Sequence, residues 1–382
     1  MLDGWVRFSP RKYKNVIYTC FRYTRNTHTS FDVNTRTVHS LDYGVLSTTS
    51  VMLNGTSFGN VQSFSDGPES SGSGKLFFYV SDLDASMQDV KENATVSFTL
   101  SEEMIGNRCS NSFIDGHDAE DPRCVRLVMT GTWRFDLNDD ERKLANESLF
   151  SRHPEMKTWP VDHHWQMGTI DVKDIWLIDI FGGASTIKVE DYDKVKAFTS
   201  VEKPSKSDPP SNPPAIDEKA QTARWLAHSA DFGILSTTSV HLNGAPFGNP
   251  QSFCDGTTDN STGKLYFYVS NLDASMQDVA QNDRVSFTLS EEFVHDSCMN
   301  QQIDPEDPRC VRLTFSGKIR DLTAGSQEES EAKSALFSRH PSMAKWPSDH
   351  NWKIVTLDID YIWMIDTFGG ASIIEVSDYY SA

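Results

Sequence analysis

The chain has 382 residues, 38% of them hydrophobic and 23% charged, which is the composition of an ordinary globular protein. Its 35 basic and 54 acidic side chains give a formal net charge of −19, which argues against binding to nucleic acid or to an anionic membrane surface. No apolar run approaches the roughly 20 residues that a bilayer requires, so we expect no transmembrane segment.

The first 35 residues have no counterpart elsewhere in the chain. Their most apolar stretch, residues 16–21, is too short for the core of a signal peptide, and its flanks are too polar. We therefore predict an unmatched N-terminal segment at residues 1–35, in which no signal peptide is visible.

Strand patterns dominate the residues that follow. We expect strands at residues 45–53, 75–80, 94–100 and 125–135, and two more, joined at 171–174, within 165–180. Helix patterns are few, and they are found at residues 84–93, with Asp84 as a candidate N-cap, and at residues 138–150. About six antiparallel strands with two helices between them predict a β-barrel of the α+β class.

The chain then repeats itself. Residues 44–51 return as residues 233–240, and the decapeptide at 151–160 returns at 338–347. A repeat this long is a whole domain, because solenoid units rarely exceed about 50 residues. We predict a first domain at residues 36–197, a proline-rich linker at 198–216 and a second domain at 217–382. Function is then expected either within one copy or between the two.

Each copy carries two cysteines at matching places: Cys109 and Cys124, then Cys298 and Cys310. Cysteine pairs that recur in both domains favour one disulfide per domain, which is typical of secreted or lumenal proteins. Two buried free thiols per copy are the alternative. Cys20 and Cys254 have no equivalent in the other copy.

Acceptor sequences for N-glycosylation occur at four positions: Asn54, Asn93, Asn146 and Asn260. The counterpart of Asn54 in the second copy, Asn243, is followed by Gly and Ala and lacks the required hydroxyl residue. We therefore predict asymmetric glycosylation of a secreted or lumenal protein.

The repeated decapeptide is followed by His-x-Trp at residues 163–165 and 350–352, then by Ile-Trp and Phe-Gly-Gly. These motifs strongly resemble the CREG glycoproteins, the "cellular repressor" family. The resemblance covers nearly all of both copies and leaves out the first 35 residues and the linker. It implies an α+β fold with two tandem Greek-key split β-barrels, like the FMN-binding barrel of pyridoxamine-phosphate oxidase. Most members have one domain and form homodimers, so the two copies are expected to form an internal pseudodimer.

The resemblance also implies a secreted or lysosomal glycoprotein with signalling or receptor-binding roles. Flavin-using relatives of this barrel hold the FMN phosphate with a basic pair that follows the aromatic strand. The places that look equivalent here are Ser86-Met87-Gln88 and Ser275-Met276-Gln277, and Met and Gln cannot neutralise a phosphate. We therefore expect no retained flavin or other cofactor, and a protein partner or receptor recognised with or without the glycans.

The alternative function is an FMN-dependent oxidoreductase of the pyridoxamine-phosphate oxidase type. Arg126, Arg152 or Lys157 would then replace the missing basic pair. Arg152 and His153 fit a second interpretation equally, as the end of a helix that Pro154 stops. A transcriptional role by direct DNA contact is disfavoured by the net charge of −19.

Histidines and tryptophans complete the set of candidate site residues. No carboxylate or thiol accompanies His163, His164 and His350 at ligand spacing in both copies, so we predict no metal site. Six repeated tryptophans are assigned either to the cores or to the surface between the copies: Trp159, Trp165, Trp176, Trp346, Trp352 and Trp363.

Overall fold

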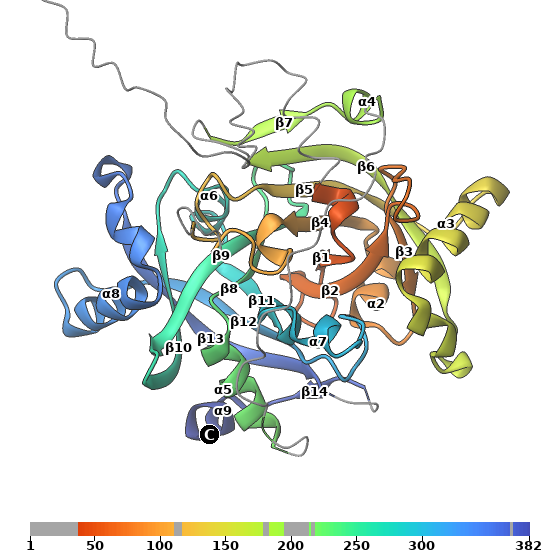
Figure 1. The fold of residues 1–382 in the computed structure, drawn as a ribbon. Helices are drawn as coiled ribbons and strands as arrows, with labels where there is room; N and C mark the ends of the chain where they lie inside the picture. The colour runs from red at the N-terminus through yellow and green to blue at the C-terminus, as the bar shows by residue number, and fades with distance from the viewer. Residues whose placement is uncertain (1–36, 111–116, 179–182, 195–213, 215–217, 367–369) are drawn as a thin grey trace, which may run out of the picture.

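The computed structural model describes residues 37–110, 117–178, 183–194, 214, 218–366 and 370–382. In these residues the chain forms two seven-stranded antiparallel sheets, one from each copy. Each sheet closes on itself, because β3 pairs with β6 in the first and β10 pairs with β13 in the second. The two barrels lie side by side, the first in red to yellow and the second in green to blue (Figure 1). The expected α+β fold with two tandem split barrels is confirmed.

The first barrel has the strand order β3-β2-β1-β4-β5-β6-β7. Its strands are β1 (Tyr43–Thr49), β2 (Ser57–Ser65), β3 (Phe77–Val80), β4 (Thr95–Ser101), β5 (Arg126–Arg134), β6 (Gln166–Ile178) and β7 (Ser185–Ile187). Its helices are α2 (Ala85–Glu92), α3 (Asp139–Arg152) and α4 (Val189–Tyr192), with 3-10 turns at Glu102–Met104, Pro154–Thr158 and Val161–His163.

The second barrel repeats this order as β10-β9-β8-β11-β12-β13-β14. Its strands are β8 (Phe232–Thr238), β9 (Pro246–Thr257), β10 (Asn260–Val269), β11 (Arg284–Ser290), β12 (Arg312–Asp321), β13 (Lys353–Ile365) and β14 (Ser372–Ile373). Its helices are α5 (Lys219–Ser229), α6 (Ala274–Val279), α7 (Ser297–Asn300), α8 (Gln327–Arg339) and α9 (Val376–Ser381), with 3-10 turns at Glu291–Phe293, Pro341–Lys345 and Ser348–His350. The helices α3 and α8 lie on opposite outer sides of the pair (Figure 1).

The helices begin at the caps that the sequence provides. Asp84 accepts hydrogen bonds from the first backbone N–H groups of α2, and Asn138 forms a capping box with Glu141 at the start of α3. Both predicted helices are therefore confirmed, and α3 runs on to Arg152, where Pro154 follows the C-cap.

Each barrel is filled by the same aromatic triad. In the first, Phe98 makes edge-on contacts with Phe64 and Phe78, with ring centroids 5.1 and 5.0 Å apart. The equivalent triad of Phe253, Phe267 and Phe287 fills the second barrel. Edge-to-face packing is the geometry that aromatic quadrupoles favour, so the triad fills both barrels in the same way. The core of the first copy also includes three residues of the second copy: Phe232, Ile234 and Phe293.

One strand was missed, and two strand predictions were wrong in part. The strand expected at 45–53 ends at Thr49, where a turn follows. The strand β2 was not expected, because its sequence alternates polar and apolar residues weakly, yet all nine of its residues are buried. The two strands expected within 165–180 are one strand, β6, whose register against β5 shifts between Thr130 and Gly131. The bulge explains the break in the sequence pattern, since an extra residue moves the following side chains to the opposite face.

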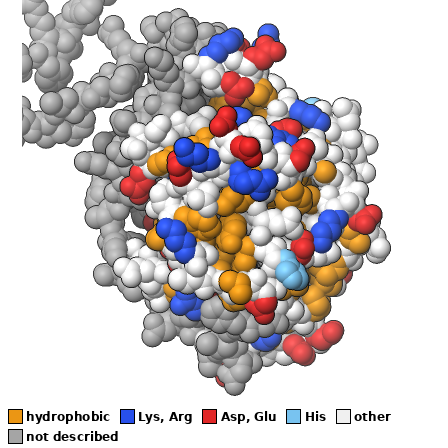
Figure 2. Space-filling view, turned by 90° about the vertical axis from the view of Figure 1, so that its right-hand side faces the viewer, with side chains coloured by type: hydrophobic (Ala, Val, Ile, Leu, Met, Phe, Trp, Pro, Cys, Tyr) orange, Lys and Arg blue, Asp and Glu red, His pale blue; other side chains and the backbone are white. Residues whose placement is uncertain are grey.

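The face that carries α3 gathers hydrophobic side chains among charged ones (Figure 2). The aromatic rings of Tyr79, Trp159 and Trp165 stack there, with centroids 4.7 to 6.2 Å apart. Beside them in the chain, Val161 is 93% exposed and Leu83 is 69% exposed. A run of exposed apolar groups next to stacked aromatics is typical of a contact surface.

Several expectations lie outside the described residues: the N-terminal segment 1–35, Cys20, most of the linker and part of each Phe-Gly-Gly motif. The domain boundaries stay predictions. Searching the described part of the chain finds no helix of the length and apolarity needed to cross a bilayer.

Candidate functional site

The two barrels meet through strands that carry small polar residues. At the centre, the hydroxyls of Ser47 and Ser236, which are equivalent residues of the two copies, share a hydrogen bond of 2.8 Å. Around them Thr99 donates to the carbonyl of Gly248, and Thr314 donates to the carbonyl of Gly59, both at 2.9 Å. These bonds satisfy strand groups that would otherwise be buried without partners.

Glycine permits this close approach. A Cβ atom placed at Gly59 would lie 2.8 Å from the Ser236 hydroxyl, and one at Gly248 would lie 2.8 Å from the Ser47 hydroxyl. Both distances are shorter than ordinary van der Waals contact, so a larger residue at either position would push the barrels apart.

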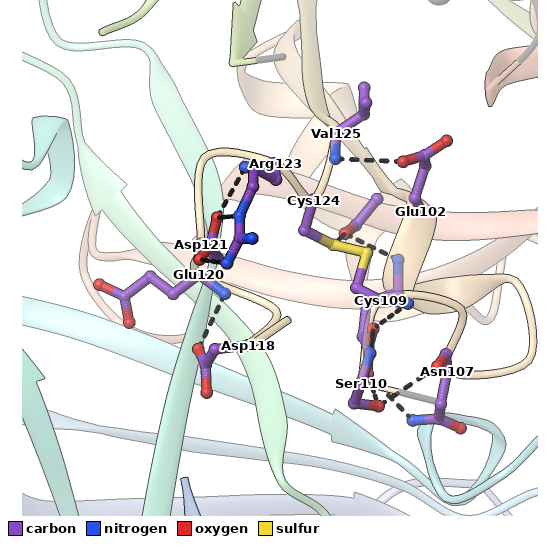
Figure 3. The surroundings of a disulfide bond; sticks show 12 residues. Glu102, Asn107, Cys109, Ser110, Asp118, Glu120, Asp121, Arg123, Cys124 and Val125 are labelled. Atoms are coloured by element: carbon purple, nitrogen blue, oxygen red, sulfur yellow. Dashed lines mark hydrogen bonds and ion pairs between the residues drawn. A yellow bond between two sulfur atoms is a disulfide. The ribbon is translucent and has the colours of Figure 1, made fainter. Parts of the chain in front are cut away.

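A disulfide-closed loop from each barrel reaches the other barrel. The structure forms the bonds Cys109–Cys124 and Cys298–Cys310, while Cys254 is a buried free thiol. Figure 3 shows that Asp118 and Glu120 extend to one side of the first disulfide. Asp118 accepts from the Ser252 hydroxyl of β9, and Glu120 accepts from the backbone N–H of the same serine.

The same carboxylate forms a buried ion pair across the barrels. Asp118 lies 2.8 Å from Nδ1 of His340, and the mirror pair joins Asp304 to Nδ1 of His153 at 2.7 Å. Burial alone would lower the pKa of His153, but the charge of Asp304 raises it to about 9. Each barrel therefore supplies a carboxylate to the other and receives one in return.

Sequence reasoning missed these loop carboxylates. The signal was present, because Asp118–Cys124 and Asp304–Cys310 share the pattern Asp-x-Glu-Asp-Pro-Arg-Cys. In the sequence this pattern is typical of a turn-rich surface segment. Its contacts are made with the other barrel, and Asp304 lies 151 residues from its partner His153.

The three basic residues considered for FMN lie apart from one another. The side chain of Arg152 is only 2% exposed and forms ion pairs with Asp42 at 2.6 Å and Asp66 at 3.1 Å inside the first barrel. Lys157 lies over the ring of Phe150. Arg126 is buried at the start of β5, where burial lowers its pKa and the nearby Glu120 and Asp273 oppose that shift.

The tryptophans divide between the two expected roles. Trp363 packs edge-on against Phe58 of the other barrel at 5.3 Å, and Trp176 does the same with Phe247. Trp159 and Trp165 instead belong to the surface stack with Tyr79, as Trp346 and Trp352 do with Tyr268. A cavity of about 600 Å³ between the barrels is lined by tryptophans of both groups, the surface stack and the contact between the barrels: Trp159, Trp165 and Trp363.

The predicted glycosylation sites lie at the surface. Asn54, Asn93, Asn146 and Asn260 are all exposed. None of these four belongs to the strands through which the barrels meet, so a glycan at any of them leaves the contact between the barrels free. His163 and His350 stack on Trp165 and Trp352, with centroids 5.8 Å apart in each case.

The family model for the CREG β-barrel matches residues 27–194 and again residues 214–381. The chain belongs to the CREG family. Human CREG2 is 43% identical over 178 residues, a match that covers 45% of this chain and 59% of that protein. Chicken CREG1 is 37% identical over 172 residues, which is 44% of this chain and 88% of that protein. The chain thus spans less than two thirds of the length of human CREG2.

Solved structures with the same kind of barrel are distant in sequence. A heme-binding protein from Mycobacterium smegmatis is 16% identical and superposes with a TM-score of 0.35, covering 45% of this chain and 62% of that one. A likeness at this level concerns the fold, so the site has to be judged on the residues of this chain.

One feature of these residues disfavours the phosphate of a flavin at the start of α2. At the start of α2, the N–H groups of Ser86 and Met87 are already bonded to Asp84. Glu306 of the other barrel lines the same cavity as Asp84, and burial together with the charge of Asp84 raises the pKa of Glu306 well above its usual range. An anion needs free N–H groups or basic partners. Here the N–H groups are taken by Asp84. The basic Arg312 lines the same cavity, but it faces the acidic Glu306 and opposes the rise in its pKa.

Substitution of Gly59 by Ala should destabilise the paired barrels by about 1–3 kcal/mol, because the added methyl group overpacks the contact with Ser236 and Thr288. Urea unfolding of the full chain measures the loss. Ser57→Ala on the same strand is the control, since the buried Ser57 hydroxyl has no hydrogen-bond partner among the described residues. Equal stability of the two variants would contradict the close contact.

The stability of the chain should fall as the pH rises from about 4.5 to about 7, because burial raises the pKa of Glu103 from 4.5 to about 7. A carboxyl with a raised folded-state pKa favours folding when it is protonated, and this contribution is lost as the pH rises through the folded value. Glu292, its counterpart, has a pKa raised by burial in the same direction.

The measurement is the free energy of unfolding at several pH values for wild type and Glu103→Gln. The variant should lose part of the pH dependence, on the order of 3 kcal/mol across this range. Glu92→Gln, which changes an exposed carboxyl on α2, is the control. A pH profile unchanged by Glu103→Gln would show that Glu103 is ionised in the folded chain.

Proposed function

We propose that this chain is a secreted or lysosomal glycoprotein that acts by binding a protein partner, with its two barrels joined as an internal pseudodimer. The observation that carries the paired arrangement is the exchange of loop carboxylates, in which Asp118 pairs with His340 and Asp304 pairs with His153. A reciprocal contact between equivalent surfaces is the pattern of a two-fold symmetric dimer, here supplied within one chain.

The placement outside the cytosol rests on three kinds of residue. Two disulfides suit an oxidising compartment, because thiols in the cytosol are kept reduced. The acceptor asparagines are exposed, as attachment of a glycan requires. The buried Glu103 and Glu292 support residence in an acidic compartment, since both side chains favour the folded state when they are protonated.

The partner surface proposed is the face that carries α3 (Figure 2). Tyr79 of the aromatic stack contacts Phe150 of α3, and Val161 and Leu83, which are close to the stacked residues in the chain, are exposed. Aromatic residues are enriched at protein interfaces. Ser348 takes the place of Val161 in the second copy, so the two faces of the molecule differ at this point.

Binding of the labelled full chain to intact cells tests this surface. Val161→Asp should weaken binding about tenfold or more, because a charge placed in an apolar contact must be desolvated when the partner docks. Ser348→Asp, the same change at the equivalent place in the second copy, should leave binding unchanged. Equal binding by both variants and wild type would remove the α3 face from the proposal. Removal of the glycans by a glycosidase measures how much they contribute to binding.

The proposal includes the absence of retained flavin. The full chain, secreted from cells that supply FMN, should be colourless and should stay colourless after soaking in FMN, because the Asp84 carboxylate already accepts from the first N–H groups of α2. Absorbance near the flavin bands, measured against protein concentration, is the readout. A stoichiometric flavin band would overturn this part and would favour the oxidoreductase alternative instead.

A further inference from the structure

Three potential metal ligands converge where the two barrels exchange their loops. His153 is the C-cap of α3, Glu155 lies two residues later in the following 3-10 turn, and Asp304 comes from the disulfide loop of the second barrel. One ligand atom of each lies within 4.8 Å of the others. The site therefore exists only when the barrels are together.

The imidazole of His153 is oriented in the way that a metal-binding histidine usually is. Its Nε2 lies 2.9 Å from the carbonyl oxygen of Phe64, which can only accept a hydrogen bond. The Nε2 atom therefore carries a proton, and Nδ1 donates a second proton to the carboxylate of Asp304 at 2.7 Å. A cation bound between these groups would replace the proton on Nδ1. A hydrogen bond from the remote ring nitrogen to a backbone carbonyl is the common support of a ligating histidine.

Glu155 adds a second carboxylate to the same place. Its side chain faces Asp304, and within the described residues no Lys or Arg forms an ion pair with it. Two carboxylates this close are stable only when a proton or a cation lies between them.

We propose that His153, Glu155 and Asp304 form a site for a divalent cation of the zinc type. One imidazole nitrogen and two carboxylate oxygens are a donor set that Zn²⁺ accepts, with a fourth position left for water. Glu155 is only partly buried, so the site has access to solvent. The expectation of no metal site rested on ligand spacing along the chain, and Asp304 lies 151 residues from His153.

The second copy provides the matched control. Its His340 repeats both hydrogen bonds, with Nδ1 at 2.8 Å from Asp118 and Nε2 at 2.8 Å from the carbonyl of Phe253. Ser342 stands in the place of Glu155, however, so the third ligand is missing. A cavity of about 320 Å³ lined by Asp118, His340 and Ser342 leaves room for a longer side chain there. One zinc ion per chain is therefore expected, and not two.

Equilibrium dialysis of the metal-free full chain against Zn²⁺, with no added histidine tag, tests the proposal. Wild type should retain one zinc ion, and Glu155→Ser should bind it more than about 100-fold less tightly, a larger loss than changes to residues that only orient a ligand produce. Ser342→Glu, which gives the second copy the ligand set of the first, should retain two. Replacement of zinc by Co²⁺ should give a visible d–d band in wild type and none in Glu155→Ser.

The thermal midpoint of each chain without metal separates loss of a ligand from loss of the fold. Glu155→Ser should unfold at the wild-type temperature without zinc and should gain no stability when zinc is added. The absence of zinc binding by wild type, or the same zinc content in wild type and Glu155→Ser, would overturn the proposal. Loss in Glu155→Ser without a gain in Ser342→Glu would support the site and confine it to the first copy.

Discussion

Burial of the loop carboxylates is the constraint on which the arrangement of the two barrels depends. An isolated carboxylate removed from water costs several kcal/mol, and the pairs of Asp118 with His340 and Asp304 with His153 offset this only when both barrels are in place. Displacement of one loop alone would leave a buried imidazolium without its partner. Both loops are therefore expected to leave the opposite barrels in a single step. The two disulfides restrict the conformations of these loops to the ones that contact the opposite barrel.

Joining two barrels in one chain also allows them to differ. In a homodimer every residue occurs at both equivalent places, so a site such as His153, Glu155 and Asp304 would occur twice. Here Ser342 replaces Glu155, and Ser348 replaces Val161. Because one chain connects the two barrels, each is at a high effective concentration for the other. Each copy can therefore carry a substitution on one of its surfaces without loss of the pairing between the barrels.

Much of the fold could be predicted from the sequence, because the motifs and caps act locally. Asp84 and Asn138 mark their helices wherever the rest of the chain lies. The strand β2 could not be predicted in the same way, since Asn60, Gln62 and Ser63 look like surface residues. They are buried by their own helix α2 and by the second barrel, through hydrogen bonds to Asp84 and Asp304. The candidate site escaped prediction for the same reason, because its residues meet only between copies.

The side chains that join the barrels also place acidic groups at the start of α2. Glu306 reaches across to the backbone of Ser63 at 3.0 Å, and it lines the cavity at the start of α2 with Asp84. A phosphate at that helix would have to displace the Asp84 cap and would face Glu306. If the proposed function is correct, the Glu306 loop accounts both for the pairing of the barrels and for the absence of flavin. A chain that regained the cofactor would have to withdraw the Glu306 loop and would lose the Asp304–His153 pair with it.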